Sequence, residues 1–215
     1  EGYEYGSFHF LEPSFLHNYT DSTIIKEWLE QYDVLLGKKQ AKHVMVTPYS
    51  RYMEWLAEQD EEEASKYWNE YLANYTEQTV IPYSKSKQKS EGYSAESVIC
   101  GFGQALTHQL QQIANRNQVT MNTVIQTMWG ILLQKYNNSE DVLFGSVVSG
   151  RPADITGIES MIGLFINTIP VRVRSRKGMT CTQLMQSMQE SALVSSKYDT
   201  YRCMKYRCKR NKNKT

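Results

Sequence analysis

The sequence predicts a domain of mixed α and β structure, in which helices alternate with strands. Three observations support this class. The 215 residues suffice for one domain with a sizeable core. Apolar side chains recur at helical spacing in several segments, whereas the short apolar runs at 141–149 and 161–175 are typical of buried strands. No internal repeat is present, so a repeat architecture is excluded, and the alternation of strands with helices indicates a mixed α and β class.

The N-terminal part begins irregularly and then turns helical. Residues 1–21 carry aromatic side chains without a sustained period, so they are expected to be strand-like or irregular. Apolar side chains then recur at helical spacing up to Gly37. A first helix is therefore expected between a cap at Ser22 or Thr23 and that glycine.

Two further helices are expected in close succession. Pro48 opens the second, because proline suits the first turn of a helix. Four large side chains fall on one face of that helix: Tyr49, Tyr52, Trp55 and Leu56. Asp60 and the acids at 61–63 favour the start of the third helix, since they face the positive end of the helix dipole.

The middle of the chain alternates between loop, strand and helix. Residues 75–92 are polar and predict a surface loop, and residues 94–102 are expected to form a strand. A helix is predicted over 105–115, followed by the strongest helical pattern of the chain, which Thr120 is expected to cap and Asn137 to end. Because apolar residues cover most of this helix's circumference, it is expected to be buried.

Two strands and a helix complete the predicted fold. The run at 141–149 is bounded by turn residues and predicts a central strand. A second long strand is expected over 161–175, where valine and arginine alternate at 171–174 between an inner and an outer face. Thr180 is expected to cap a last helix that runs to about Ser196.

Composition and charge exclude several classes of protein. Lys and Arg number 24 against 23 Asp and Glu, which argues against a broad nucleic-acid or membrane-binding surface. No run approaches a membrane-spanning length, so a cytoplasmic location is expected. The four cysteines lack paired spacing, and neither a disulfide framework nor a metal site is expected. The basic segment 202–215 is expected to be a disordered, solvated tail, which is favoured over a nucleic-acid arm.

Few residues suggest catalysis by their type and spacing. His17 has an acid four residues on, Asp21, that is able to fix its tautomer for general-base chemistry, although a purely structural pair would look the same. Ser149 follows a buried strand but lacks the nucleophile-elbow pattern. Arg151, at the end of the same strand, is expected to need a carboxylate such as Asp21.

Three stretches, at 47–60, 122–152 and 161–174, resemble the condensation domain of nonribosomal peptide synthetases. The first matches the family's Tyr–Tyr–Trp motif and the third its Gly-x-Phe-x-Asn-Thr motif. The matching residues are Tyr49, Tyr52 and Trp55, and Gly163, Phe165, Asn167 and Thr168. The order and separation of the stretches agree with the family, and the resemblance covers roughly residues 22–201.

The resemblance implies a chloramphenicol-acetyltransferase-like fold, with a mixed sheet flanked by helices. Residues 22–201 are then a partial condensation domain, mostly its C-terminal lobe, and residues 1–21 a degenerate remnant of the catalytic-loop region. Almost the whole N-terminal lobe would be missing. An apolar interface would therefore be exposed, and the isolated chain is expected to be poorly soluble.

The resemblance also implies an acyltransferase of antibiotic biosynthesis, which forms an amide bond between two carrier-bound substrates. Its partners are peptidyl carrier proteins and neighbouring synthetase domains. No cofactor is bound directly, because the carriers bring their own phosphopantetheine arms. Epimerisation and cyclisation relatives share the fold and stay open as subtypes. A catalytically inactive remnant or carrier-docking module is the alternative, and the motifs disfavour an acetyltransferase that uses free acyl-CoA.

The family's catalytic signature, His-His-x-x-x-Asp-Gly, is only partly present. In the register that aligns Asp21 with its aspartate, His17 takes the place of the catalytic histidine. Leu16 then replaces the first histidine and Ser22 the glycine. A second register, starting at His9, retains one histidine and loses the aspartate.

Two further interpretations rest on the resemblance. Arg151 corresponds to a brace of the signature's aspartate. After Tyr201 the family continues with a sequence like Pro-Leu-Tyr-Glu-Ile-Gln, and a shift of one nucleotide in its codons yields the Arg-Cys-Met-Lys-Tyr-Arg found at 202–207. The basic tail is therefore interpreted as a frameshift product, and residues 1–21 are suggested to have the same origin.

Overall fold

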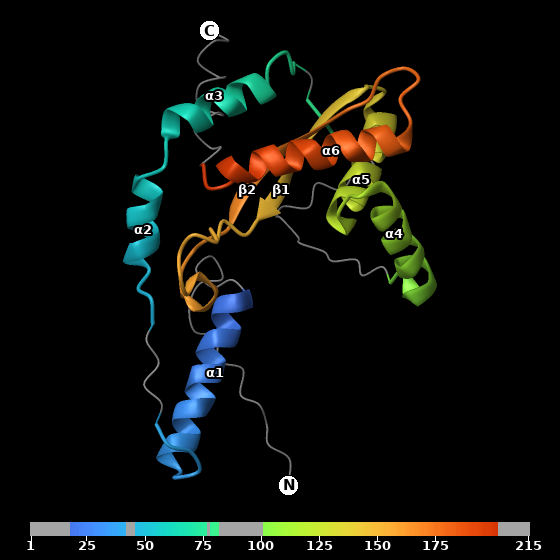
Figure 1. Cartoon of the computed structure of the whole chain (residues 1–215). Coiled ribbons are helices and arrows are strands. Elements are labelled where there is room, and N and C mark those ends of the chain that lie inside the picture. The colour runs from blue at the N-terminus through green and yellow to red at the C-terminus, as the bar shows by residue number, and fades with distance from the viewer. Residues whose placement is uncertain (1–17, 42–45, 77, 82–100, 202–215) are drawn as a thin grey trace, which may run out of the picture. The chain divides into compact units, whose positions relative to one another are not determined.

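The computed structural model describes residues 18–41, 46–76, 78–81 and 101–201, with the backbone alone for 18–23 (Figure 1). Its helices are α1 (Asn18–Leu35), α2 (Ser50–Ala57), α3 (Glu61–Tyr71), α4 (Gly103–Asn117), α5 (Met121–Asn137) and α6 (Cys181–Ser195). Its strands are β1 (Asp141–Val148) and β2 (Asn167–Arg174), and the short 3-10 helices are η1 (Ile158–Ser160) and η2 (Ser196–Tyr198). The predicted mixed α and β class is confirmed.

The chain divides into two compact units. The first comprises residues 1–62 and 147–168, and includes α1, α2 and η1. The second comprises residues 63–146 and 169–215, and includes α4, α5, α6 and most of α3 and of the two strands. No helix in the described ranges is long and apolar enough to cross a membrane.

Helix starts agree well with the predicted caps. The side chain of Thr120 accepts a hydrogen bond from the amide of Thr123 at the start of α5. Thr180 and Gln183 form a reciprocal capping box at the start of α6, with distances of 3.2 and 2.9 Å between side-chain oxygen and amide nitrogen. Asp60 accepts from the second residue of α3 at 2.9 Å. These caps satisfy amides that a helix leaves without internal partners.

Two predicted boundaries are wrong. The first helix begins at Asn18, before the expected cap at Ser22 or Thr23. The second strand begins at Asn167 instead of residue 161, because residues 163–166 pack against the aromatic side chains of α2 instead of pairing in the sheet. Most of the strand expected at 94–102 lies outside the described residues.

The second unit is built on a two-stranded ribbon, β1 and β2. The amide of Ser175, just after β2, donates to the carbonyl of Glu140, just before β1, at 2.8 Å, so the strands run antiparallel. Side chains from α5, both strands and α6 form a common core: Leu133, Val142, Val173, Leu184 and Met188. Gly130 permits this packing, because a Cβ there would lie 2.5 Å from a methyl group of Val173.

In the described part of the chain, helix α5 is buried on one face, so the prediction that it is buried holds for that face and is wrong for the opposite one. The core side is lined by small, polar or aliphatic residues such as Thr127 and Leu133. Five larger apolar side chains point to the other side and are at least 38% exposed: Ile125, Met128, Trp129, Leu132 and Tyr136. The described strands and α6 reach one side of α5, which explains the difference.

Helix α3 is attached to the end of α6 by aromatic side chains. Trp68 is completely buried and its indole N–H donates to the carbonyl of Tyr198 at 3.3 Å. The ring of Tyr67 stacks on that of Tyr198 at 4.6 Å, and its hydroxyl lies 2.8 Å from the Ser195 hydroxyl. Tyr67 and Trp68 therefore serve packing.

Candidate functional site

The predicted catalytic pair falls largely outside the structure. His17 lies outside the described residues, as do His9 and His43. Asp21 lies on the first turn of α1, but its side chain is not among those described. The roles given to His17 and Asp21 therefore stay predictions. His108 lies on α4 and is exposed.

The two family motifs meet in the first unit. The hydroxyl of Tyr49, just before α2, donates to the carbonyl of Leu164 at 2.8 Å, although the residues are 115 positions apart. The ring of Tyr49 meets that of Phe165 edge-on at 5.3 Å between centroids. Helix α2 thus holds the segment 161–166 by one hydrogen bond and one aromatic contact.

Buried apolar side chains complete this contact. Tyr52 is 5% exposed and its ring lies 4.7 Å from that of Phe165. The ring of Trp55 stacks on Tyr52 at 6.2 Å. Ile158 of η1 and Met161 belong to the same core. We call this set the motif cluster: Tyr49, Tyr52, Trp55, Arg151, Ile158, Met161 and Phe165.

Glycines allow the close approach. At Gly163 a Cβ would overlap the ring of Tyr49. Gly150 has φ +57°, which glycine adopts without strain, and a Cβ there would overlap the carbonyl oxygen of Phe165. Steric overlap therefore explains why glycine stands at these positions of the Gly-x-Phe and Ser-Gly-Arg-Pro segments.

Arg151 connects the third segment to the cluster. Its guanidinium donates to the carbonyls of Ile158 and Met161, with 3.1 Å to the latter. It also lies 3.9 Å above the centre of the Phe165 ring, a cation–π contact. The structure thus gives Arg151 a bracing role toward η1 and Phe165. The predicted brace to Asp21 stays a prediction.

Asn167 and Thr168 mark the end of the motif and the start of β2. The side-chain oxygen of Asn167 accepts from the amide of Thr168 at 2.9 Å. This local bond turns the chain from the irregular segment into the strand. Among the residues that the structure describes, no three His, Cys, Asp or Glu side chains gather to hold a metal ion.

Arg151→Ala should lower the free energy of unfolding by about 1–3 kcal/mol, because two part-buried carbonyls lose their donor. Arg151→Lys keeps the charge but not the planar contact with Phe165, so we expect partial rescue. Urea unfolding of both variants measures this. An unchanged midpoint for Arg151→Ala would show that the guanidinium contributes nothing to the cluster.

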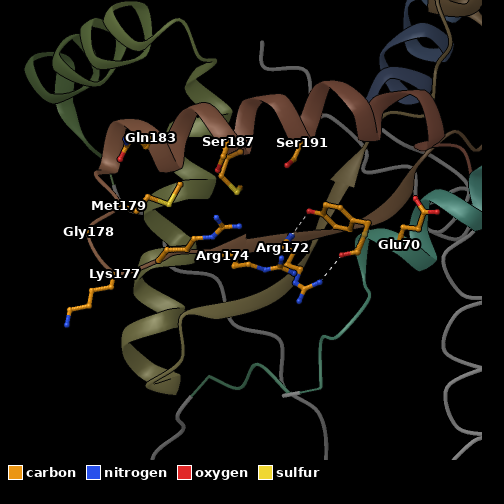
Figure 2. Close-up of a pocket in the computed structure, with 12 residues that line it drawn as sticks. Glu70, Arg172, Arg174, Lys177, Gly178, Met179, Gln183, Ser187 and Ser191 are labelled. Carbon is orange, nitrogen blue, oxygen red and sulfur yellow. Dashed lines mark hydrogen bonds between the residues drawn. The ribbon is translucent and has the colours of Figure 1, made fainter.

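The second unit contains a second polar centre, which was not predicted from the sequence. Arg172 was expected on the outer face of its strand, yet it is 7% exposed. Its guanidinium forms a bidentate pair with Asp141, at 2.8 and 2.5 Å, and donates to the carbonyl of Ala73. It also donates to the carbonyl of Tyr71 (Figure 2). Asp141 at the head of β1 was the available signal, since a charged residue inside a sheet needs such a partner.

Tyr71 covers the same strand from α3. Its hydroxyl accepts a hydrogen bond from the backbone amide of Arg172 at 2.8 Å (Figure 2). Burial raises the pKa of Tyr71 to about 12, and it outweighs the opposing effect of the Arg172 amide. The Tyr71 hydroxyl therefore pairs with a backbone amide at the edge of β2, and that amide would otherwise be free to pair with another strand.

Tyr71→Phe should cost about 1–3 kcal/mol at pH 7, because the Arg172 amide loses its acceptor. The raised pKa means that the folded state favours the neutral phenol of Tyr71. The contribution of Tyr71 to the free energy of unfolding is therefore complete below pH 10 and is lost as pH rises toward 12. The stability difference between wild type and Tyr71→Phe should accordingly shrink above pH 10. A pH-independent difference would contradict this linkage.

Solved structures with the same architecture are condensation domains and a related domain. The first condensation domain of the calcium-dependent antibiotic synthetase, in complex with substrate analogue 3a, matches with a TM-score of 0.69 at 14% identity over 89% of this chain and 43% of that one. The X-domain from teicoplanin biosynthesis matches with a TM-score of 0.71 at 18% identity, over 87% of this chain and 44% of that one. The predicted chloramphenicol-acetyltransferase-like fold of mixed α and β class is thereby confirmed, although the sheet in the described residues is an antiparallel pair, and this chain spans less than half of these solved chains.

The family model of the condensation domain matches residues 22–215, and the chain belongs to this family. A mycosubtilin synthase protein from Bacillus subtilis is 49% identical over 178 residues, which are 83% of this chain and 7% of that protein. Tyrocidine synthase 2 of Brevibacillus parabrevis is 45% identical over 83% of this chain and 5% of its own length. The chain thus spans less than a tenth of these relatives.

Proposed function

We propose that this chain contributes to a condensation domain that joins a carrier-bound peptidyl or aminoacyl thioester to a carrier-bound aminoacyl amine. The amine nitrogen attacks the thioester carbonyl, the C–N bond forms, and the C–S bond breaks. The thiol of the donor arm leaves with one proton. The thioester is already activated, so the enzyme's main contribution is alignment of the two substrates.

The motif cluster is the observation that carries this proposal. Three segments converge into one packed unit, and the one around Tyr49 is about a hundred residues from those around Arg151 and Phe165. These are the segments that resemble the family in sequence. The polar groups of the cluster bind backbone carbonyls and aromatic rings of the cluster itself. The cluster therefore supports the proposal as a rigid element that positions other groups.

We assign the proton-handling role to His17, with Asp21 fixing its tautomer and Arg151 bracing the aspartate. An imidazole in that place is able to take the amine's proton or to stabilise the tetrahedral intermediate. The substrates arrive on the phosphopantetheine arms of peptidyl carrier proteins. Neighbouring synthetase domains are the other partners, and the chain itself needs no directly bound cofactor.

The test supplies the chain with two carrier proteins, one loaded with a peptidyl thioester and one with an aminoacyl thioester. Mass spectrometry measures the amide product, and calorimetry measures carrier binding. The chain alone is expected to be inactive, so the missing N-terminal lobe is supplied with it. We then expect product with wild type, and at least a hundredfold less with His17→Ala at unchanged carrier binding. Unchanged amide formation in His17→Ala would remove His17 from the mechanism.

One sequence observation favours a second function, a docking module without turnover. Leu16 and Ser22 stand where the family signature has histidine and glycine. Such a module would bind carriers as tightly as an active domain. Saturable carrier binding with no product in the wild-type protein would identify it and overturn the catalytic proposal.

A further inference from the structure

A cationic pocket in the second unit shares no residue with the motif cluster. It has a volume of about 770 Å³ and lies between α3, β2, the following loop and α6 (Figure 2). Pockets of roughly 300–1,000 Å³ commonly hold small organic ligands. The size therefore suits an organic molecule better than a single ion.

The charge of the pocket is positive. Four cations line it, Arg172, Arg174, Arg176 and Lys177, against one acid, Glu70. Asp141 neutralises Arg172 by a bidentate pair, whereas it touches Arg174 through one longer contact of 3.5 Å.

Arg174 and Arg176 are the cations available to a ligand. Arg174 is 49% exposed in its side chain, and Figure 2 shows it between β2 and α6, whereas Lys177 points outward. Within the described part of the chain, the Arg176 side chain has no hydrogen-bond partner. An arginine fork matches the oxygens of a phosphate group.

Helix α6 presents a polar stripe to these arginines. Gln183, Ser187 and Ser191 are spaced four residues apart and therefore lie along one face of the helix, which lines the pocket. The Gln183 amide nitrogen and the Ser191 hydroxyl are the donors of this stripe that are available to phosphate oxygens, because Ser187 donates to the carbonyl of Leu184 at 3.0 Å and the Gln183 oxygen belongs to the capping box. Met179, Met188 and Tyr71 add apolar surface beside the polar groups.

We propose that this pocket binds a phosphate monoester with an apolar or aromatic portion. The phosphate lies against Arg174 and Arg176 and accepts hydrogen bonds from the stripe on α6. The organic portion packs on the two methionines and the ring of Tyr71. This binding is independent of amide formation and does not involve the motif cluster.

Phenyl phosphate is a suitable probe, because it joins a dianion to one aromatic ring, and inorganic phosphate is its comparison. Calorimetry with the full chain should show saturable binding of phenyl phosphate, at least fivefold tighter than inorganic phosphate, and weaker at higher ionic strength. Arg174→Gln and Arg176→Gln should each reduce affinity about tenfold or more, since each removes a charge-assisted hydrogen bond.

Lys135→Gln is the matched control, because it removes the same charge from an exposed position in the last turn of α5, outside the pocket. We expect it to bind phenyl phosphate like wild type. Melting curves of all three variants verify that they are folded. The proposal is overturned if wild type shows no saturable binding, if both arginine variants bind normally, or if hexaglutamate binds more tightly than phenyl phosphate.

Discussion

Arg172→Ala should lower the free energy of unfolding by about 3–5 kcal/mol, the largest effect expected of any single polar residue here. The Arg172 side chain is 5% exposed, and its guanidinium donates hydrogen bonds to the Asp141 carboxylate and to the carbonyls of Tyr71 and Ala73. Its removal leaves the Asp141 carboxylate without its main partner and two carbonyls without donors. The hydrogen bond and charge of Asp141 also raise the pKa of Arg172, so the guanidinium stays ionised at any ordinary pH.

Arg174→Ala is the matched control for this measurement. Arg174 lies two residues along the same strand and approaches the same carboxylate, but at 3.5 Å and with 49% of its side chain exposed. We expect its loss to cost less than about 1 kcal/mol. Arg172→Lys should rescue little, because an ammonium group does not reproduce the bidentate fork. Equal effects of the two alanine variants in urea unfolding would show that burial of Arg172 contributes no stability.

Local features of the fold were predictable from the sequence. Thr120, Thr180 and Asp60 cap helices where the pattern indicated, because a cap depends on a few adjacent residues. The apolar run at 141–149 became β1 within one residue of each predicted end. Such features need no knowledge of distant partners.

Features that depend on distant partners were not predictable. The valine–arginine alternation placed Arg172 outside, and only the position of Asp141 on the neighbouring strand shows why it lies inside. The apolar segment before Asn167 looked like a strand, yet its Phe165 packs on α2, more than a hundred residues earlier. For the candidate site, the motif residues were found by resemblance, while their mutual contacts needed the structure.

The interactions that stabilise the first unit therefore differ from those that stabilise the second. In the motif cluster, aromatic rings and one guanidinium fix segments that have no regular pairing. In the second unit, one apolar cluster joins α4, α5 and α6, and another joins α5 and α6 to the ribbon. Changes to the motif cluster should consequently alter the geometry of the family motifs before they affect the β1–β2 ribbon.

Gly150→Ala is the substitution that tests this most directly. Its φ of +57° costs an alanine about 1–2 kcal/mol, and the added Cβ would overlap the carbonyl oxygen of Phe165. Relief of the overlap requires a backbone shift, which typically costs a further ~1–3 kcal/mol. Phe165 is the residue on which Tyr49, Tyr52 and Arg151 converge, so a shift there disturbs the whole cluster.

Gly37→Ala separates the two contributions. Gly37 belongs to the same unit and has φ +69°, but a Cβ there would meet no atom within 4 Å. It should therefore cost only the backbone strain. Urea unfolding gives both stabilities, and hydrogen exchange at residues 158–166 reports the local loosening. We expect Gly150→Ala to lose at least about 1 kcal/mol more than Gly37→Ala and to exchange faster in that segment alone. Equal losses, with unchanged exchange, would mean that the contact between Gly150 and Phe165 does not hold the motifs together.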